Sequence, residues 1–228
     1  MRVVAIISRK GGAGKTNIAV HLAACAEGRG MRAGIVDLDP QATSTKWAAR
    51  RTESASFAGA DVVSAQAFSL PKLLAEARGA GARLMLLDTA PHADAMAVDA
   101  ARAADFVLIP CRPAIADIEA IPASADIARL AGKPFAVVLN AAIAKGTRAD
   151  EARSELERLG LVVAPVEVGH RVAFGDAMIP GQGVTESRPG SAAAQEIEGL
   201  FDWMLRHFES DAASGRLVAA KTRRRVAA

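Results

Sequence analysis

The sequence contains very few aromatic residues and no tyrosine. Phe, Trp and Tyr together make up 4% of the chain, whereas 51% of the residues are hydrophobic, so the core must be built from aliphatic side chains. That composition is typical of helices packed on a parallel sheet whose strands are buried on both faces. A chain of 228 residues can form one globular domain with a full core, or at most two small ones.

Cysteine and long apolar runs are also scarce. Cys25 and Cys111 are too few for a disulfide framework, so we predict two small core residues in a reducing compartment. No apolar run reaches membrane length, and "MRVVAIIS" leads into a glycine-rich loop where a secretory leader would have a cleavage site. No G-x-S-x-G elbow and no His or Cys metal spacing occurs, which argues against acyl transfer and zinc sites. We therefore expect a cytoplasmic protein.

The positive charge is concentrated near the C-terminal end of the sequence. The formal net charge is +3, but residues 211–228 hold five basic residues against one acidic residue, which leaves −1 for residues 1–210. The composition after Ser210 turns to Ala, Ser, Gly and Arg, which predicts a loose segment. We therefore predict a single domain over residues 1–210 and a basic, flexible tail over residues 211–228.

Short apolar runs alternate with alanine-rich segments of helix length. The runs lack polar alternation, as expected of strands that are buried on both faces. The predicted strands are residues 3–7, 33–36, 83–87, 106–109, 135–139 and 162–166. The predicted helices are residues 15–29, 42–52, 69–79, 92–103, 117–131, 148–159 and 191–209. This order predicts an α/β fold in which a single-domain, doubly wound, mostly parallel sheet carries helices on both faces.

The segment "KGGAGKT", Lys10 to Thr16, lies between the first predicted strand and the first predicted helix. Its glycines let backbone N–H groups point inward, and the helix N-terminus adds partial positive charge, so the segment suits a phosphate group. Lys15 would contact the β- and γ-phosphates, and the Thr16 hydroxyl would bind Mg²⁺. The predicted nucleotide-binding residues of this loop are Lys10, Gly11, Gly12, Ala13, Gly14, Lys15, Thr16 and Asn17.

The loop departs from the usual spacing G-x-x-x-x-G-K-[ST]. Arg9 stands in place of the first glycine, and a second lysine, Lys10, follows it. Since Lys15 already serves the phosphates of its own loop, we predict that Lys10 points outward. Two copies facing each other could each place this cation on the other's nucleotide, as an arginine finger does. The alternative is a surface lysine on a monomer.

Carboxylates follow two of the predicted strands. Asp37 and Asp39 come after the second strand, and Asp88 ends the apolar run "RLMLLD". Open α/β sheets place ligand groups at the carboxyl ends of their strands, and Asp88 could hold Mg²⁺ there, usually through water. The alternatives are a solvated turn at Asp39–Pro40 and a helix cap at Asp88.

These motifs together resemble the ParA/MinD superfamily. "KGGAGKT" is similar to its deviant Walker A motif, "GIVDLDPQATSTKW" (34–47) to its second strand and switch segment, and "LMLLDTAP" (84–91) to its Walker B strand. "VLIPCRPAIADIEA" (107–120) resembles the next strand and loop. Residues 169–186 and 190–204 resemble the C-terminal part of short, partition-type ParA proteins. The resemblance covers nearly the whole chain.

The resemblance assigns roles to residues and implies ATP and Mg²⁺ as cofactors. Lys10 would act across an ATP-sandwich dimer, Asp39 would orient the attacking water, and Asp37 would lie near the Mg²⁺ shell. Asn140 is similar to an adenine-reading residue, although an asparagine at a strand end is also an ordinary turn residue. The predicted catalytic residues are Lys10, Lys15 and Asp39. The predicted magnesium ligands, partly through water, are Thr16, Asp37 and Asp88.

The resemblance further implies a slow, Mg²⁺-dependent ATPase that binds DNA nonspecifically as an ATP homodimer. It would position a plasmid, a chromosome region or a protein cluster, be associated with the nucleoid, and be stimulated by a ParB-like or other partner protein. Arginines suit the phosphate backbone of DNA, whereas a solvated surface is the alternative for the same residues. The predicted DNA-binding residues are Arg171, Arg188, Arg206, Arg223, Arg224 and Arg225.

Two other functions fit the same loop. A MinD-like ATPase binds membrane through an amphipathic helix, but the tail "GRLVAAKTRRRVAA" offers one large apolar residue, Leu217, so we expect no membrane partner. A metabolic P-loop enzyme, either a small-molecule kinase or a synthetase, would need an acceptor pocket. We find no motif for such a pocket in the sequence.

Overall fold

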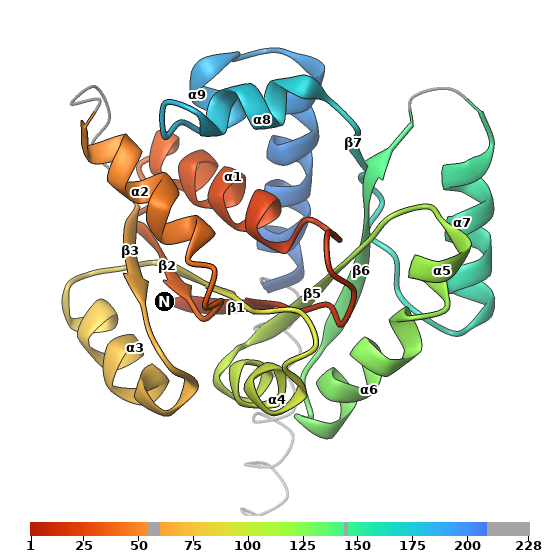
Figure 1. Cartoon of the computed structure of the whole chain (residues 1–228), viewed down its shortest axis with the longest axis horizontal. Helices are drawn as coiled ribbons and strands as arrows, with labels where there is room; N and C mark the ends of the chain where they lie inside the picture. Colours follow the sequence, from red (N-terminus) through yellow and green to blue (C-terminus); the bar gives the residue numbers. More distant parts are fainter. Residues whose placement is uncertain (54–59, 144–145, 209–228) are drawn as a thin grey trace, which may run out of the picture.

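A seven-stranded parallel sheet forms the centre of the computed structural model, which describes residues 1–53, 60–143 and 146–208 (Figure 1). The strand order is β3-β2-β4-β1-β5-β6-β7. The strands are β1 (Arg2–Ile6), β2 (Ala33–Asp37), β3 (Asp61–Ser64), β4 (Leu84–Asp88), β5 (Phe106–Cys111), β6 (Phe135–Ala142) and β7 (Val168–Gly169). The chain winds from β1 first toward β3 and then, from β5 on, toward β7, so the predicted doubly wound α/β fold is confirmed.

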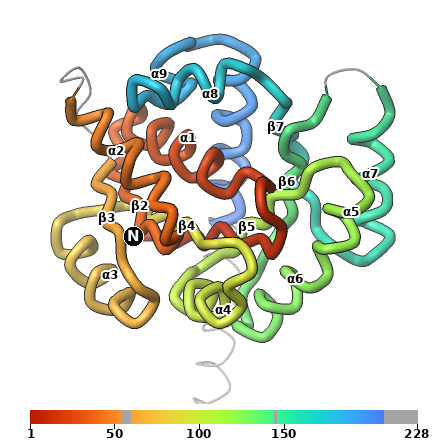
Figure 2. Tube along the Cα trace, in the orientation of Figure 1, coloured from red at the N-terminus to blue at the C-terminus, as the bar shows by residue number. Residues whose placement is uncertain are grey.

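Helices cover both faces of this sheet, as the ribbon and the tube both show (Figures 1 and 2). The helices on one face are α1 (Lys15–Gly28), α2 (Thr43–Glu53), α8 (Val172–Met178), α9 (Val184–Ser187) and a helix over residues 192–208. The helices on the other face are α3 (Leu70–Gly79), α4 (Asp94–Ala103), α5 (Ile115–Ile118), α6 (Ile121–Leu130) and α7 (Arg148–Arg158). A single 3₁₀ turn, η1 (Ala67–Ser69), precedes α3.

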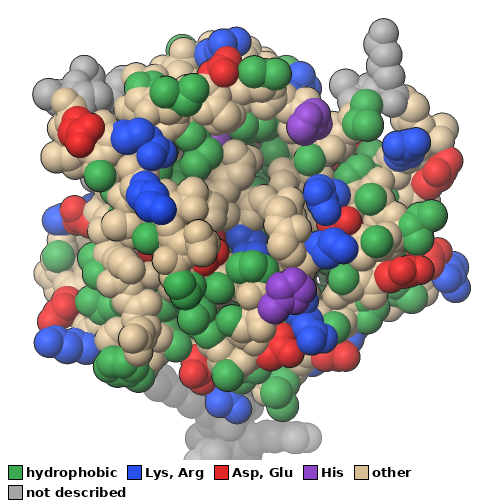
Figure 3. All heavy atoms as spheres, in the orientation of Figure 1, with side chains coloured by type: hydrophobic (Ala, Val, Ile, Leu, Met, Phe, Trp, Pro, Cys, Tyr) green, Lys and Arg blue, Asp and Glu red, His purple; other side chains and the backbone are tan. Residues whose placement is uncertain are grey.

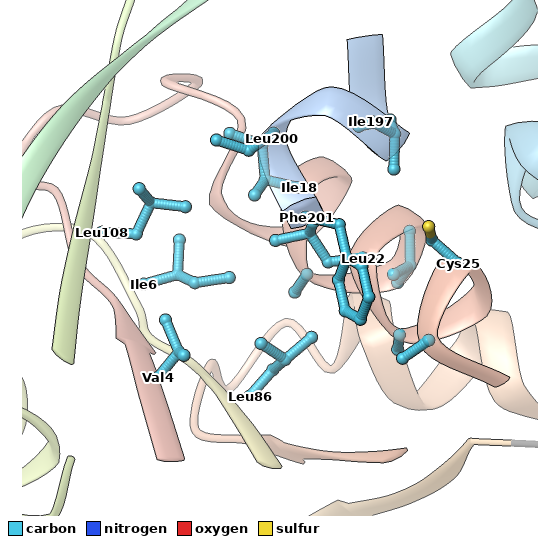
Figure 4. Close-up of a cluster of buried hydrophobic side chains, with 14 of the residues drawn as sticks. Val4, Ile6, Ile18, Leu22, Cys25, Leu86, Leu108, Ile197, Leu200 and Phe201 are labelled. Atoms are coloured by element: carbon cyan, nitrogen blue, oxygen red, sulfur yellow. The ribbon is translucent and has the colours of Figure 1, made fainter. Parts of the chain in front are cut away.

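The central strands bury side chains on both faces because successive residues of a strand point to opposite sides. In β1, Val4 and Ile6 face the cluster formed with α1 and the helix 192–208, whereas Val3 and Ala5 face the cluster on the α3–α7 side. Figure 4 shows the first cluster, in which Phe201 lies among side chains from the sheet and α1. This double burial explains the uninterrupted apolar runs in the sequence.

Two predicted elements are wrong, and proline accounts for the second. Residues 162–166 do not form a strand, because this segment makes only an isolated bridge from Val163 to Val137 of β6. The predicted helix 117–131 is interrupted between α5 and α6. Pro122 stands in the first turn of α6, where its missing N–H is harmless, but a helix continuing through it would clash with the preceding turn.

Other differences fall on short elements. The sequence analysis missed β3, an edge strand with only Val62 and Val63 as apolar residues, and it missed α8 and α9. The predicted tail, residues 211–228, lies outside the described residues. Within the described ranges, no helix has both the length and the apolar character needed to cross a bilayer.

A buried histidine joins α1 to the short helices α8 and α9. The His21 side chain has no exposed surface, and its Nδ1 accepts a hydrogen bond from the Val184 N–H at 3.0 Å. Its ring lies 5.0 Å from that of Phe174. Burial lowers the pKa of His21 from 6.5 to about 4, so the folded protein holds the ring neutral.

This shift predicts a loss of stability in mild acid. The unfolded chain takes up a proton at His21 below pH 6.5 and the folded chain only near pH 4, so protonation favours unfolding. Across that window we expect the His21 contribution to the free energy of unfolding to fall by about 3 kcal/mol. Urea titrations of the wild type and His21→Gln would measure it, since their stability difference should shrink as pH falls. Parallel pH curves would contradict the assignment.

Candidate nucleotide-binding site

The sheet register brings distant parts of the sequence to one edge. Asp88, the last residue of β4, pairs with Ile6 of β1 on one side and with Asp37 of β2 on the other. The loop from Ser8 to Gly14 starts beside this pair and leads into α1. The predicted loop and the predicted carboxylates therefore meet at the carboxyl ends of adjacent parallel strands.

The loop needs glycine at two positions where its backbone is left-handed. Gly12 has φ 73° and Gly14 has φ 97°, a region that residues with a Cβ rarely adopt. At Gly14 a Cβ would also lie 2.0 Å from Asn140 Nδ2. That amide donates a hydrogen bond to the Ala13 carbonyl at 2.7 Å and is buried. The end of β6 thus closely supports the loop backbone.

Lys15 places a buried positive charge under the loop. Its side chain is 6% exposed, and its ammonium donates to the Ser8 carbonyl at 3.3 Å. Burial lowers the pKa of Lys15, while the carboxylates of Asp88 and Asp39 raise it. A buried ammonium beside backbone N–H groups at a helix N-terminus suits a phosphate group.

Asp88 is fully buried and only partly hydrogen-bonded. Its Oδ2 accepts from the Ser44 hydroxyl at 2.7 Å, and its Oδ1 has no partner in the part of the chain that the structure describes. Burial raises the pKa of Asp88 to about 6, although hydrogen bonds from Ser44 and Thr16 and the charge of Lys15 lower it. An unpartnered buried carboxylate oxygen beside a threonine hydroxyl fits Mg²⁺, which keeps several waters of its own.

Asp37 and Asp39 organise the segment that leads into α2. Asp37 Oδ2 accepts from both the N–H and the hydroxyl of Thr45 at 2.9 Å, and its Oδ1 accepts from the Asp39 N–H at 3.1 Å. Asp37 therefore fixes the start of α2, a contribution that the sequence analysis missed; its predicted place near Mg²⁺ stays a prediction. Asp39 is half-buried, and its Oδ1 accepts from the Gln41 N–H at 2.9 Å.

Backbone strain is concentrated around the same edge of the sheet. Within the described ranges, the non-glycine residues with positive φ are Ala42 (52°), His92 (55°) and Ala141 (53°). Ala42 follows β2, His92 follows β4, and Ala141 lies next to Asn140 near the end of β6. Strain of this kind is characteristic of functional sites, where the surrounding structure holds it in place.

The cations near the loop differ in what they contact. Arg9, which replaces the first glycine, forms an ion pair with Asp94 of α4 at 3.0 Å. The Lys10 ammonium makes no hydrogen bond or ion pair with any described residue, and its side chain is partly exposed. The sequence analysis missed Arg112, whose Nη1 would lie 3.8 Å from a Cβ on Gly12. The segment 107–120 was recognised, but nothing in its pattern singled out the arginine.

The structure separates the arginines that were predicted to bind DNA. Arg171 pairs with Glu196 at 2.6 Å and Arg188 with Asp176 at 3.0 Å, whereas Arg206 is exposed and has no ion pair within the described ranges. The remaining three, at 223–225, lie outside the described residues. On the face shown in Figure 3, basic and acidic side chains are interspersed with apolar ones. That face therefore offers no continuous basic surface.

Curated relatives of this chain are named for carboxysome distribution or for chromosome partitioning. The chain is 28% identical over 210 residues to "Maintenance of carboxysome distribution protein A" of Halothiobacillus neapolitanus, covering 89% of this chain and 95% of that protein. The protein of the same name from Gloeobacter kilaueensis is 39% identical over 119 residues, covering 51% and 52%. "Chromosome-partitioning ATPase Soj" of Thermus thermophilus is 32% identical over 135 residues, covering 48% and 54%. The chain thus spans about half the length of these last two.

Solved structures match the fold over most of the chain. McdA of Cyanothece superposes with a TM-score of 0.72 in its apo form, at 14% identity, covering 90% of this chain and 99% of that chain. A variant of the same protein in an ATP complex gives 0.71 at 15% identity, covering 90% and 96%. The cell division ATPase MinD of Pyrococcus furiosus gives 0.71 at 18% identity, covering 90% and 98%. At these identities the likeness concerns the fold.

The family assignment comes from a match of the sequence itself. Residues 4–202 match the CobQ/CobB/MinD/ParA nucleotide binding domain, and this range takes in the loop, β1 from Val4 on, strands β2 to β7, and the carboxylates Asp37, Asp39 and Asp88. The matched range also ends within the helix 192–208. The chain therefore belongs to the CobQ/CobB/MinD/ParA nucleotide-binding family.

Proposed function

We propose that this chain is a Mg²⁺-dependent ATPase that dimerises around two ATP molecules, binds DNA nonspecifically and positions a cellular cargo with a partner protein. The observation that carries this proposal is the Lys10 ammonium. It stands at the lip of the phosphate loop without any described partner, although Lys15 already provides the buried cation of the same loop. A cation in that position can serve a second copy of the site.

The side chains of the site would divide the chemistry as follows. Lys15 and the loop N–H groups hold the phosphates, while Thr16 and the unpartnered Oδ1 of Asp88 hold Mg²⁺. Bound Mg²⁺ supplies positive charge to the phosphate oxygens. Asp39 is held by its own turn and accepts a hydrogen bond from the attacking water.

The trans role of Lys10 has a clear electrostatic advantage. A triphosphate with Mg²⁺ keeps negative charge, and a lysine that becomes desolvated between two copies would neutralise it more strongly than in water. Cations supplied in this way accelerate phosphoryl transfer on the order of 10³-fold or more. Dependence on a second copy would keep the monomer slow and leave hydrolysis open to stimulation by a partner, either ParB-like or of another kind.

The names of the relatives bear on the kind of cargo. Two relatives are named for carboxysome distribution and one for chromosome partitioning, so their names support a protein assembly or a chromosome region as the cargo. The ATP dimer would be bound to chromosomal DNA while it positions the cargo, which implies association with the nucleoid. Of the three described arginines that were predicted to bind DNA, Arg206 is best placed for phosphate contacts, because Arg171 and Arg188 are already paired with acids.

Two alternative functions would each give a different experimental result. A membrane-associated ATPase of the MinD kind would pellet with liposomes in the presence of ATP. A metabolic enzyme of the CobQ or CobB kind would show turnover that depends on a small acceptor molecule. DNA-dependent pelleting without liposome binding, and ATP turnover without any acceptor, would favour the positioning ATPase over both.

Asn140 has a role in this proposal that differs from base reading. Its amide Nδ2 is already committed to the Ala13 carbonyl, and it lies where a Cβ on Gly14 would be. The side chain therefore supports the loop directly. Without it, the buried Ala13 carbonyl loses the Asn140 amide as its hydrogen-bond donor, which costs about 1–3 kcal/mol for an unsatisfied buried group.

The first prediction from the proposed function concerns Lys10. We expect Lys10→Ala to bind ATP as a monomer within about twofold of the wild type but to lose the ATP-dependent dimer, because its ammonium would contact only the partner's nucleotide. Sedimentation velocity with ATP and Mg²⁺ measures this. Lys72→Ala, on the exposed surface of α3, is the matched control and should dimerise normally, whereas Lys15→Ala should lose nucleotide binding. A Lys10→Ala protein that dimerises at the wild-type concentration would disprove the trans role.

The second prediction concerns Asn140. We expect Asn140→Ala to weaken nucleotide binding by about fivefold or more, and to do so equally for ATP and GTP, because the lost hydrogen bond supports the loop and not the base. Titration with fluorescent derivatives of both nucleotides measures it. A loss confined to ATP would instead establish Asn140 as the adenine reader.

The third prediction concerns DNA. With ATP, binding to random duplex DNA should weaken steeply with salt, and Arg206→Ala should reduce the slope of log K against log[salt] by about 0.9. Arg171→Ala, whose charge is balanced by Glu196, should change it little. Equal DNA binding with ATP and with ADP would mean that the basic residues in 211–228 bind DNA by themselves. An unchanged salt slope for Arg206→Ala would show that Arg206 does not contact DNA.

A further inference from the structure

Arg112 lies beside the phosphate loop although the sequence places it about 100 residues away. It follows Cys111, the last residue of β5, and β5 is the direct neighbour of β1 in the sheet. Its Nη1 would be 3.8 Å from a Cβ placed on Gly12, near the exposed tip of the loop. The guanidinium group therefore reaches the backbone that the site uses to bind phosphate.

A buried carboxylate fixes the orientation of this guanidinium. Arg112 Nε donates to Asp117 Oδ1 at 2.9 Å, and Nη2 donates to Asp117 Oδ2 at 3.1 Å. Asp117 belongs to α5 and is 4% exposed, so it cannot move to follow the arginine. Two parallel hydrogen bonds hold the planar group in one orientation, as a single bond to a lysine would not.

The same geometry leaves one nitrogen available. Asp117 occupies the Nε and Nη2 edge, and Nη1 makes no hydrogen bond to any residue that the structure describes. Nη1 is also the atom nearest to Gly12. The Arg112 side chain is 39% exposed, so the guanidinium group is not enclosed in the protein core.

A purely structural ion pair explains only part of this arrangement. Burial of Asp117 requires a cation nearby, and Arg112 meets that need. That need does not account for the position of Nη1, which lies beside Gly12 of the phosphate loop. Among the other cations of the loop, Arg9 is paired with Asp94 and Lys15 is buried beneath it.

We propose that Arg112 is a further phosphate-binding residue of this ATPase, acting on the nucleotide of its own subunit, and that Asp117 is its positioning residue. The inference rests on the proposed nucleotide binding at the loop. Nη1 donates to a phosphate oxygen above Gly12, while Asp117 keeps the guanidinium plane aimed at the loop. The ion pair thereby converts a half-exposed arginine into a preorganised anion contact.

ADP affinity tests the proposal, because ADP binding does not require the ATP-dependent dimer. Titration with a fluorescent ADP derivative should show that Arg112→Ala weakens binding about tenfold or more, as expected for a hydrogen bond to a charged group. Asp117→Asn should weaken it less. The double variant should bind no worse than Arg112→Ala, because Asp117 acts through the arginine. Arg129→Ala, which removes an exposed Arg–Asp pair on α6, is the matched control and should bind normally.

Thermal unfolding without nucleotide separates this role from a structural one. If Arg112 had only a structural role, Arg112→Ala would lower the melting temperature and leave the ADP affinity of the folded protein unchanged. That result would overturn the proposal. Additive losses in the double variant would overturn the positioning role of Asp117. If the wild type itself bound no ADP, the proposed function would fail first, and the two failures are therefore distinguishable.

Discussion

The site depends on one electrostatic constraint, the burial of Lys15 and Asp88 at the edge where three parallel strands end. Neither charge has enough exposed surface to be solvated, since Asp88 has none and Lys15 is 6% exposed. Each therefore depends on the other and on hydrogen bonds from its surroundings. The strand register enforces their proximity, because Asp88 lies between Ile6 and Asp37. A polyphosphate with its cation would complete this partly satisfied arrangement.

Helix α2 connects the carboxylates of the site to the α8–α9 region. At its start, Ser44 and Thr45 hold the carboxylates of the site. At its far end, Arg51 forms a buried ion pair with Glu186 at 2.6 Å, and Trp47 donates to the Gln182 carbonyl. The residues that contact the strand edge and those that contact the α8–α9 region thus belong to one short helix. A shift of the Asp39 segment would therefore displace α2 and change its contacts both with the carboxylates of the site and with Glu186.

Much of the fold was predictable because its signals are local. Each central strand is buried on both faces, so its apolar run is continuous, and the loop "KGGAGKT" fits only between a strand and a helix. The failures were also local in origin. The apolar run at residues 162–166 makes only one bridge to β6, Pro122 interrupted a helix, and β3 was missed because an edge strand needs little apolar sequence.

The sequence by itself determined the chemistry of the site, since Lys15, Thr16 and Asp88 are recognisable from their neighbours along the chain. Only the tertiary structure decided which polar side chains of the site are already held by contacts within the protein. Asp37 proved to hold Thr45 of α2, 8 residues further along the chain. Asn140 proved to support the loop and Arg112 to face Gly12, and these two contacts join residues that the sheet order brings together from distant positions. Local sequence patterns encode backbone conformation and burial, whereas contacts between strand ends exist only after the parallel sheet has formed.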